Sequence, residues 1–258
     1  MVGADTCGFN DNINEESCNR WMQLPAFVSF DRNHNTYAAL PQEPYRWESV
    51  ANASRIVIAV RYSLLLPYWY TLFANSSMAG LPPVRALFYE FPDEPELFTV
   101  DRQWLVGSDT LATPVLTPGA TTVDGVFAGS VMWPDWYTHA ASHQRPHPGQ
   151  LCSITASRAG YTIYETREGP YLLLTADTAF GTAYVDDGTS RTYKIEGNGE
   201  YTVLQKLEMI TVPGVQKSTL VSLQGSPVKG WAYKEATEEL VASNTSVNLN
   251  GQTTLVWK

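Results

Sequence analysis

Two short polar loops contain the residues whose types and spacing are best suited to chemistry. One begins at Asp5 and continues through Cys7 and Phe9, and the other, residues 31–35, is centred on His34. Each loop follows a short apolar run that predicts a β-strand. Parallel α/β folds build their sites from the loops at the carboxyl ends of strands, so these two loops are the first candidates for a functional site.

The remaining histidines do not support a metal site. They recur every four residues late in the chain, as His139, His143 and His147. A helix would bring that spacing to one face, but Pro146 and Pro148 would break such a helix. Among the cysteines, Cys7 and Cys18 lie close together and Cys152 stands apart, and the simplest interpretation is three buried thiols. We therefore expect neither a metal nor a cofactor.

Composition and charge exclude several classes of protein. The 258 residues are 44% hydrophobic and 12% aromatic, which is too rich in aromatics for an intrinsically disordered chain. With 26 acidic against 17 basic residues and no basic stripe, nucleic-acid binding is not expected. The most apolar stretch, residues 55–73, contains Arg55, Arg61 and Pro67, so it predicts buried helices rather than a membrane span. An acidic, aromatic-rich surface fits a neutral polar ligand such as a sugar better than a phosphate.

The signals for the cellular compartment conflict. The chain starts Met-Val-Gly-Ala-Asp, with neither the basic nor the apolar segment of a signal peptide. Three N-glycosylation sequons, at Asn52, Asn75 and Asn244, nevertheless favour secretion weakly. The two observations agree if these 258 residues are the rear part of a longer protein.

The elements that must hold the two loops have α/β character. Strands are predicted over residues 1–4 and 26–30, and a helix with one apolar face over 14–24. A longer helical stretch, residues 43–80, is predicted to be broken at Pro67. Strand, polar loop and helix in repetition are typical of a parallel sheet or barrel. Because an eight-stranded barrel needs about 250 residues, two such units cannot close one.

Beyond Pro82-Pro83 the sequence predicts β-structure. Short runs of β-branched and aromatic residues are separated by turns that contain Pro, Gly and Asp. The runs cover residues 84–90, 104–106, 113–116, 136–138, 161–164, 171–175, 182–185, 201–203, 209–212 and 255–257. We interpret them as two small β-sandwiches.

Motifs along nearly the whole chain resemble those of a known family. They lie at residues 3–9 (Gly-Ala-Asp-Thr-Cys-Gly-Phe), 18–24, 32–35 (Arg-Asn-His-Asn), 42–45, 61–65, 91–93, 106–109, 113–116, 135–138, 184–188 and 255–257. The chain is similar to the C-terminal part of a glycoside hydrolase family 31 α-glucosidase, most of all to the secreted fungal type. The fold that this implies is α/β plus all-β, an incomplete C-terminal piece of a (β/α)8 TIM barrel followed by two β-sandwiches. Residues 1–81 would be the last two βα units, 82–150 the proximal sandwich and 151–258 the distal one.

The resemblance also implies an activity. The family consists of retaining glycosidases, with one carboxylate as nucleophile and another as acid/base. The resemblance implies that this chain is part of an exo-acting α-glucosidase that releases terminal α-linked glucose from maltose- or starch-type oligosaccharides. The family's motifs for both carboxylates are missing here, and Asp31 and Asp93-Glu94 are expected to be solvated surface rather than substitutes. We therefore expect the chain alone to be inactive, with a malto-oligosaccharide substrate and the missing N-terminal part of the barrel as its partners. Secretion, but no membrane association, follows from the same resemblance.

Roles for the residues of the two loops also follow from the resemblance. His34 matches the histidine that hydrogen-bonds glucose hydroxyls, a task suited to an imidazole because it offers one donor and one acceptor. Phe9 matches the aromatic residue that packs on the same sugar. Asp5 would support the site without touching the sugar, or merely cap its loop. Cys7 and Cys18 match a family disulfide that closes the loop carrying Phe9.

Two departures from the family pattern leave alternatives open. Residues 64–67 contain one Leu more than the family usually has before the proline, which would rotate the flanking helix by about 100° unless a bulge absorbs it. Residues 145–153 replace an expected strand, and we hypothesise a frameshift or misjoined exon there. The alternatives are a truncated remnant without activity and a non-catalytic α-glucan-binding sandwich. The exposed aromatics of such a module would be Trp133, Trp136 and Tyr137.

Overall fold

The computed structural model divides the chain into two units, residues 1–129 and 130–258. In the first unit the structure describes residues 3–129. In the second it describes residues 133, 135–136, 152–156, 171–175, 206–212, 217, 219–236, 238–248 and 254–257. The three histidines at 139, 143 and 147 and the strands expected at 161–164, 182–185 and 201–203 lie outside the described residues. The domain boundaries expected after residues 81 and 150 stay predictions.

The first unit begins with two short parallel strands. β1 (Asp5–Thr6) pairs with β2 (Arg32–Asn33), with Asp5 opposite Arg32 and Thr6 opposite Asn33. Both strands begin later than the sequence indicated, because residues 3–4 and 28–30 are irregular and Pro25–Phe27 form a 3-10 turn, η1. The strand predicted at 26–30 is therefore wrong, and residues 3–4 of the strand predicted at 1–4 are irregular, while the parallel pairing matches the expected pattern.

Side chains from later elements explain why residues 25–30 do not form a strand. The guanidinium of Arg61 donates to the carbonyls of Pro25, Val28 (2.7 Å) and Ser29 (3.2 Å). The indole nitrogens of Trp69 and Trp104 donate to the carbonyls of Ala26 (2.9 Å) and Phe27 (2.8 Å). These carbonyls therefore have their partners in side chains, and a strand ladder is not needed to satisfy them.

Helix α1 (Glu15–Trp21) follows β1 and has the start that the sequence predicts. The side chain of Asn14 accepts a hydrogen bond from the backbone nitrogen of Ser17 at 2.8 Å, which caps the helix, and two glutamates occupy its first turn. The helix ends at Trp21 instead of Leu24, since the next residues are a turn leading into η1.

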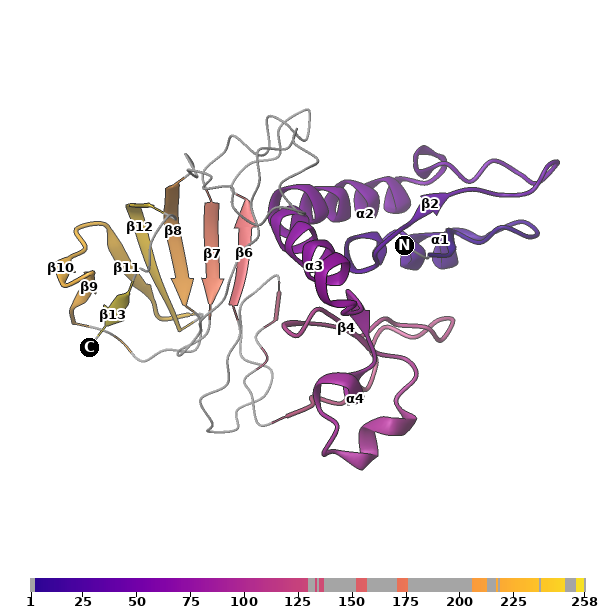
Figure 1. The fold of residues 1–258 in the computed structure, drawn as a ribbon. Helices are drawn as coiled ribbons and strands as arrows, with labels where there is room; N and C mark the ends of the chain where they lie inside the picture. Colours follow the sequence, from indigo (N-terminus) through magenta and orange to yellow (C-terminus); the bar gives the residue numbers. More distant parts are fainter. Residues whose placement is uncertain are drawn as a thin grey trace. The chain divides into compact units, whose positions relative to one another are not determined.

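The long helical stretch after β2 has more pieces than expected. A short 3-10 turn, η2 (Pro44–Arg46), precedes α2 (Glu48–Ala59), and α3 (Leu66–Ala79) follows (Figure 1). Between them, Val60–Leu65 form a π-helical segment, η3. Pro67 therefore does not break the stretch. A π segment is the usual way to hold an extra residue within a helix, so the bulge foreseen as one outcome for residues 64–67 is present and includes the first two of them. No helix among the described residues has the length and apolar character that crossing a membrane requires.

A small antiparallel sheet follows α3. Its order is β3–β4–β5, with β3 at Val84–Arg85, β4 at Trp104–Val106 and β5 at Thr110–Ala112. Between β3 and β4 lie the short helix α4 (Leu87–Glu90) and the 3-10 turn η4 (Pro95–Thr99), so the strand expected over 84–90 ends at Arg85. The strand expected over 113–116 is wrong, because β5 ends at Ala112 and those residues are irregular.

A buried tyrosine joins α3 to this sheet. The Tyr68 hydroxyl donates to the carbonyl of Val106 at 2.8 Å and lies 3.2 Å from a carboxylate oxygen of Asp109. Burial raises the pKa of both groups, and the hydrogen bonds that Asp109 receives from Ser108 and Tyr68 offset part of its shift. Gly107 has a φ of +60° and passes so close that an added Cβ would lie 2.0 Å from the Tyr68 hydroxyl oxygen.

The second unit contains two sheets. The five-stranded sheet has the order β11–β12–β8–β7–β6 (Figure 1). Its strands are β6 (Cys152–Ala156), β7 (Tyr171–Thr175), β8 (Lys206–Val212), β11 (Trp231–Lys234) and β12 (Glu239–Asn248). The three-stranded sheet has the order β10–β9–β13, formed by Ser226–Pro227, Val221–Leu223 and Leu255–Trp257. One buried cluster combines residues of both sheets, among them Val212 and Leu240 with Val221, as expected of a β-sandwich.

Candidate functional site

The loops after β1 and β2 bring Phe9 and His34 together. Their ring centroids are 5.4 Å apart and the ring planes are inclined by 38°. Both side chains remain accessible, with Phe9 41% exposed and His34 in the exposed class. Because the two strands are parallel, the two loops leave the same edge of the pair. The structure thus unites the aromatic residue and the imidazole that the sequence placed in separate loops.

The loop that carries Phe9 begins with a tight turn. The nitrogen of Gly8 donates to the carbonyl of Asp5 at 2.8 Å, and within this turn Cys7 and Gly8 have φ values of +68° and +88°. Such values suit Gly8, but for Cys7 they cost about 1–2 kcal/mol. Beyond the turn, the nitrogen of Thr36 donates to the carbonyl of Phe9 at 2.9 Å. This backbone bond links the first loop to the second.

A disulfide holds Cys7 in this conformation. Its sulfur is bonded to that of Cys18 in α1, which is the pairing implied by the family resemblance, and both cysteines are buried. They pack in a cluster with Met22 and Val50, so the bond connects the loop to the apolar face of α1 and to α2. Helix α1 therefore serves as the support for the loop that presents Phe9.

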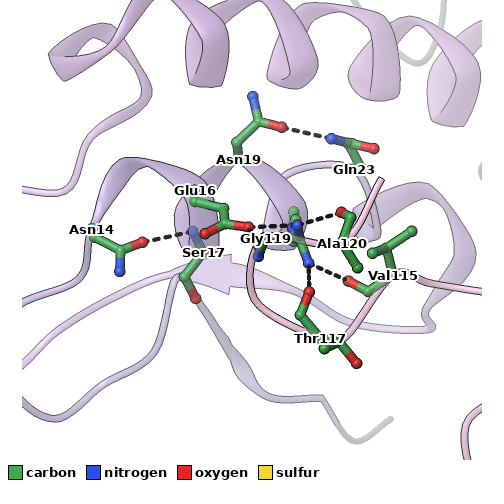
Figure 2. A network of polar contacts seen from close by, with 10 residues as sticks. Asn14, Glu16, Ser17, Asn19, Gln23, Val115, Thr117, Gly119 and Ala120 are labelled. Atoms are coloured by element: carbon green, nitrogen blue, oxygen red, sulfur yellow. Dashed lines mark hydrogen bonds and ion pairs between the residues drawn. The ribbon is translucent and has the colours of Figure 1, made fainter. Parts of the chain in front are cut away.

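Helix α1 is itself fixed from its other side by Arg20 and Glu16. The guanidinium of Arg20 donates to the carbonyls of Val115 (3.4 Å), Thr117 (2.5 Å) and Ala120 (2.8 Å). Glu16 accepts from Arg20 at 2.5 Å and from the backbone nitrogen of Gly119 at 2.6 Å. Figure 2 shows Glu16 next to Gly119, with Val115, Thr117 and Ala120 close by. The two charged side chains thus bind α1 to a loop about a hundred positions later in the sequence.

Gln42 connects the two loops, a role that sequence reasoning missed. Its side-chain nitrogen lies 2.9 Å from Oδ1 of Asn33, 3.1 Å from the carbonyl oxygen of Gly8 and 3.4 Å from that of Thr6. Gln42 was noticed only as part of the family motif at 42–45. A polar residue between Pro41 and Glu43 gives no sign in the sequence that it will be buried.

Asp5 and Arg32 form an ion pair across the two strands. The guanidinium Nε of Arg32 lies 2.7 Å from Oδ1 of Asp5. The Asp5 carboxylate is the less exposed partner, with 21% of its side chain accessible against 57% for Arg32. This contact suits the supporting role expected of Asp5, because it ties the first residue of β1 to the first residue of β2.

Asp31, directly before β2, is half-buried, contrary to the expectation of a solvated side chain. Burial raises the pKa of its carboxyl, and the positive charge of Arg61 opposes that shift. Burial lowers the pKa of the Arg61 guanidinium, and the negative charge of Asp31 opposes that shift. Because Arg61 also donates to the carbonyls of residues 25–29, Asp31 belongs to the support beneath β2 and not to the exposed Phe9–His34 pair.

The other predicted residues lie apart from this pair. Asn52 in α2 is exposed and accepts a hydrogen bond from Arg55 at 2.5 Å, and Asn75 in α3 is half-buried. Asn244 is exposed where the β12–β8 register shifts and has a φ of +53°. Of the aromatics proposed for glucan binding, Trp133 is only 5% exposed, so it cannot form an open stacking platform. Trp136 is half-buried, and Tyr137 and the side chain of Cys152 are outside the described residues.

Taken together, the described residues can recognise a hydroxyl-rich ligand. The imidazole of His34 can donate and accept hydrogen bonds, and the face of Phe9 offers an apolar surface beside it. Within residues 3–129 and the described parts of the second unit, no group of three or more His, Cys, Asp or Glu side chains could hold a metal ion. The carboxylate at the start of the loop that carries Phe9, that of Asp5, is engaged by Arg32.

Comparison with protein families gives two matches. Residues 1–72 match the glycosyl hydrolases family 31 TIM-barrel domain, and residues 80–168 match the glycosyl hydrolase family 31 C-terminal domain. Among curated proteins, an α-glucosidase of Schizosaccharomyces pombe is 41% identical over 93% of this chain and 29% of its own length. An α-glucosidase of Aspergillus niger is 39% identical over 88% of this chain and 27% of its own length. The chain thus spans less than a third of these relatives.

Solved structures share the fold at lower identity. A glucosidase II α subunit bound to Glc1Man2 superposes with a TM-score of 0.82 at 23% identity, covering 99% of this chain and 34% of that one. A Flavobacterium johnsoniae family 31 dextranase in complex with glucose gives a TM-score of 0.79 at 21% identity, covering 97% of this chain and 38% of that one. Both confirm a partial TIM barrel followed by β-sheet structure.

Proposed function

Because the chain belongs to glycosyl hydrolase family 31 and corresponds to its C-terminal portion, we propose that it supplies the glucose-recognising loops of an α-glucosidase. The substrate class is an oligosaccharide with a terminal α-linked glucose, as in maltose or the ends of starch. The comparisons support this proposal because the two fungal relatives are named α-glucosidases and are 41% and 39% identical to this chain.

The observation that carries this proposal is the contact between Phe9 and His34. A pyranose has an apolar face and a rim of hydroxyls, so it needs a flat apolar surface next to groups that donate and accept hydrogen bonds. Phe9 and His34 offer this combination with 5.4 Å between ring centroids. Disulfide, turn and strand pairing hold both residues on one edge, so little ordering would be needed when the sugar binds.

The hydrolysis itself needs two further groups. Retaining glycosidases place a nucleophilic carboxylate and an acid/base carboxylate about 5–5.5 Å apart on either side of the scissile bond. Asp5 is paired with Arg32 and Asp31 faces Arg61, so neither is suited to these roles. We therefore assign both catalytic carboxylates to the part of the relatives that this chain does not match, and that part is the proposed partner of the chain.

An assay of the purified chain tests the assignment of the carboxylates. With maltose or a chromogenic α-glucoside as substrate, we expect no turnover above a buffer control, because recognition alone does not cleave the bond. Turnover by the 258-residue chain would mean that the catalytic pair lies within it. A non-catalytic fragment and one portion of an active enzyme are then distinguished by supplying the remaining part of the barrel.

We also propose that the chain matures in the secretory pathway, with N-glycans at Asn52, Asn75 and Asn244. A buried disulfide supports an oxidising compartment. Of the three sequons, Asn52 and Asn244 are exposed, and Asn244 lies at an irregular strand position. Expression in a yeast secretory host, followed by removal of N-glycans, should increase electrophoretic mobility, and an unchanged mobility would refute the glycosylation.

A further inference from the structure

We propose that Gln42 is a positioning residue that sets Phe9 and His34 at their mutual distance and orientation. The effect of Gln42 on sugar binding rests on the function proposed above. The contacts by which one buried amide holds both loops do not depend on a bound sugar.

The contacts of the Gln42 side chain carry the argument. Its Nε2 lies 3.1 Å from the carbonyl oxygen of Gly8 and 2.9 Å from Oδ1 of Asn33. Gly8 is the residue directly before Phe9, and Asn33 is the residue directly before His34. A single nitrogen with two hydrogens therefore bonds to the backbone of the residue before Phe9 and to the side chain of the residue before His34.

The orientation of this amide is fixed by a reciprocal bond. Nδ2 of Asn33 donates to the backbone carbonyl of Gln42 at 2.9 Å, while Oδ1 of the same Asn33 accepts from the Gln42 side chain. The two residues thus close a small ring of hydrogen bonds. Gln42 is only 4% exposed. If its side-chain nitrogen is removed, water therefore has little access to the oxygen atoms that this nitrogen contacts.

The other links between the two loops are made on either side of Gly8, the residue directly before Phe9. The strand pairing ends at Thr6 and Asn33, and the disulfide holds the first loop only at Cys7. Past those points, the Thr36 nitrogen donates to the Phe9 carbonyl at 2.9 Å and the Leu40 nitrogen donates to Oδ1 of Asn12 at 2.7 Å, and neither bond involves the residue directly before a ring. Gln42 belongs to neither loop, so it adds a further point of support from the segment that leads into η2.

Two substitutions separate this role from a general effect on the fold. Gln42→Met removes the donor and the acceptor of the side chain while keeping its length and nearly its volume. Gln23→Met is the matched control, because the side-chain nitrogen of Gln23 also donates to an asparagine, Oδ1 of Asn19 at 2.6 Å, but Gln23 is exposed in the turn after α1 (Figure 2). Both variants lose one Gln–Asn pair in the same unit.

The experiment is nuclear magnetic resonance on the full chain with selectively labelled Phe and His rings. His34→Gln identifies the His34 signals by their loss. We expect the cross-relaxation between the Phe9 and His34 rings to fall several-fold in Gln42→Met and to stay at the wild-type level in Gln23→Met. An undiminished Phe9–His34 signal in Gln42→Met would overturn the inference.

A second variant keeps the test decisive if Gln42→Met does not fold. Asn33→Asp retains the acceptor for the Gln42 nitrogen but loses the bond to the Gln42 carbonyl, so a partial loss of the ring-to-ring signal is expected, and an unchanged signal contradicts the inference. Adding methyl α-glucoside to the wild-type chain tests the proposed function separately. A shift of the His34 signals supports it, and their insensitivity to the sugar refutes it, whatever the ring-to-ring signal shows.

Discussion

Breaking the Cys7–Cys18 disulfide should destabilise the support of the sugar loop by a calculable amount. The bond joins residues 11 positions apart. The chain-entropy relation for a loop of this length gives about 2.8 kcal/mol at 25 °C. Replacing both cysteines by alanine also empties part of a buried cluster, for which deletions of single buried groups suggest roughly 1 kcal/mol more for each residue.

Reduction and substitution separate these two contributions. A reducing agent breaks the cross-link but leaves both sulfurs in place, whereas Cys7→Ala with Cys18→Ala removes the sulfurs as well. We expect the free energy of unfolding of the first unit to fall by about 3 kcal/mol on reduction and by roughly 4–5 kcal/mol on substitution. Urea titration under oxidising and reducing conditions measures both differences.

Amide hydrogen exchange shows where stability is lost. Residues 8–13 and the first turn of α1 should exchange faster after reduction, because they lie inside the closed loop, while β4 and β5 should keep their protection. A change on reduction below about 1 kcal/mol would refute the reasoning, since it would mean that the loop is held as firmly by its other contacts.

Three further predictions concern contacts within the first unit. Arg20→Met should cost about 1–3 kcal/mol in urea titration, because three carbonyls in residues 115–120 lose their charged donor, whereas the control Gln23→Met should cost little. Gly107→Ala should lower the Tm by roughly 5–10 °C in thermal unfolding, since the new Cβ meets the Tyr68 hydroxyl and φ is positive. Burial raises the pKa of the Asp109 carboxyl in the folded chain above its unfolded value of about 3.9. The folded state therefore binds this proton more tightly than the unfolded state does, and the stability falls as the pH rises from the unfolded pKa through the folded pKa. Urea titrations at acidic and neutral pH should therefore show that wild type loses stability relative to Asp109→Asn as pH rises, and the opposite trend would contradict this assignment.

The sequence predicted which two loops lie together better than it predicted the elements beneath them. Asn14 and the apolar spacing after it predicted α1, since a cap and one apolar face are local properties. The strand expected over 26–30 was wrong because Arg61, Trp69 and Trp104, all distant in sequence, occupy the carbonyls of residues 25–29. Local patterns contain no information about such partners.

Gln42 illustrates the same limit within the site. Phe9, His34 and the disulfide could be assigned from a family resemblance, and the structure places the two rings in contact and forms the bond. The roles in sugar binding stay predictions. The burial of Gln42 and its bonds to Gly8 and Asn33 depend on the arrangement of three separate segments, which no spacing in the sequence indicates.

Above all, we propose that His34 recognises glucose within a family 31 active site. The most direct test replaces the matching C-terminal part of the Schizosaccharomyces pombe α-glucosidase by this chain and compares kcat/KM for maltose with and without His34→Ala. Two lost hydrogen bonds of about 1.5 kcal/mol each predict a fall of roughly 100-fold, while the exposed aromatic control Tyr45→Ala should be near wild type. A value for His34→Ala within about threefold of the unsubstituted chimera would contradict the claim.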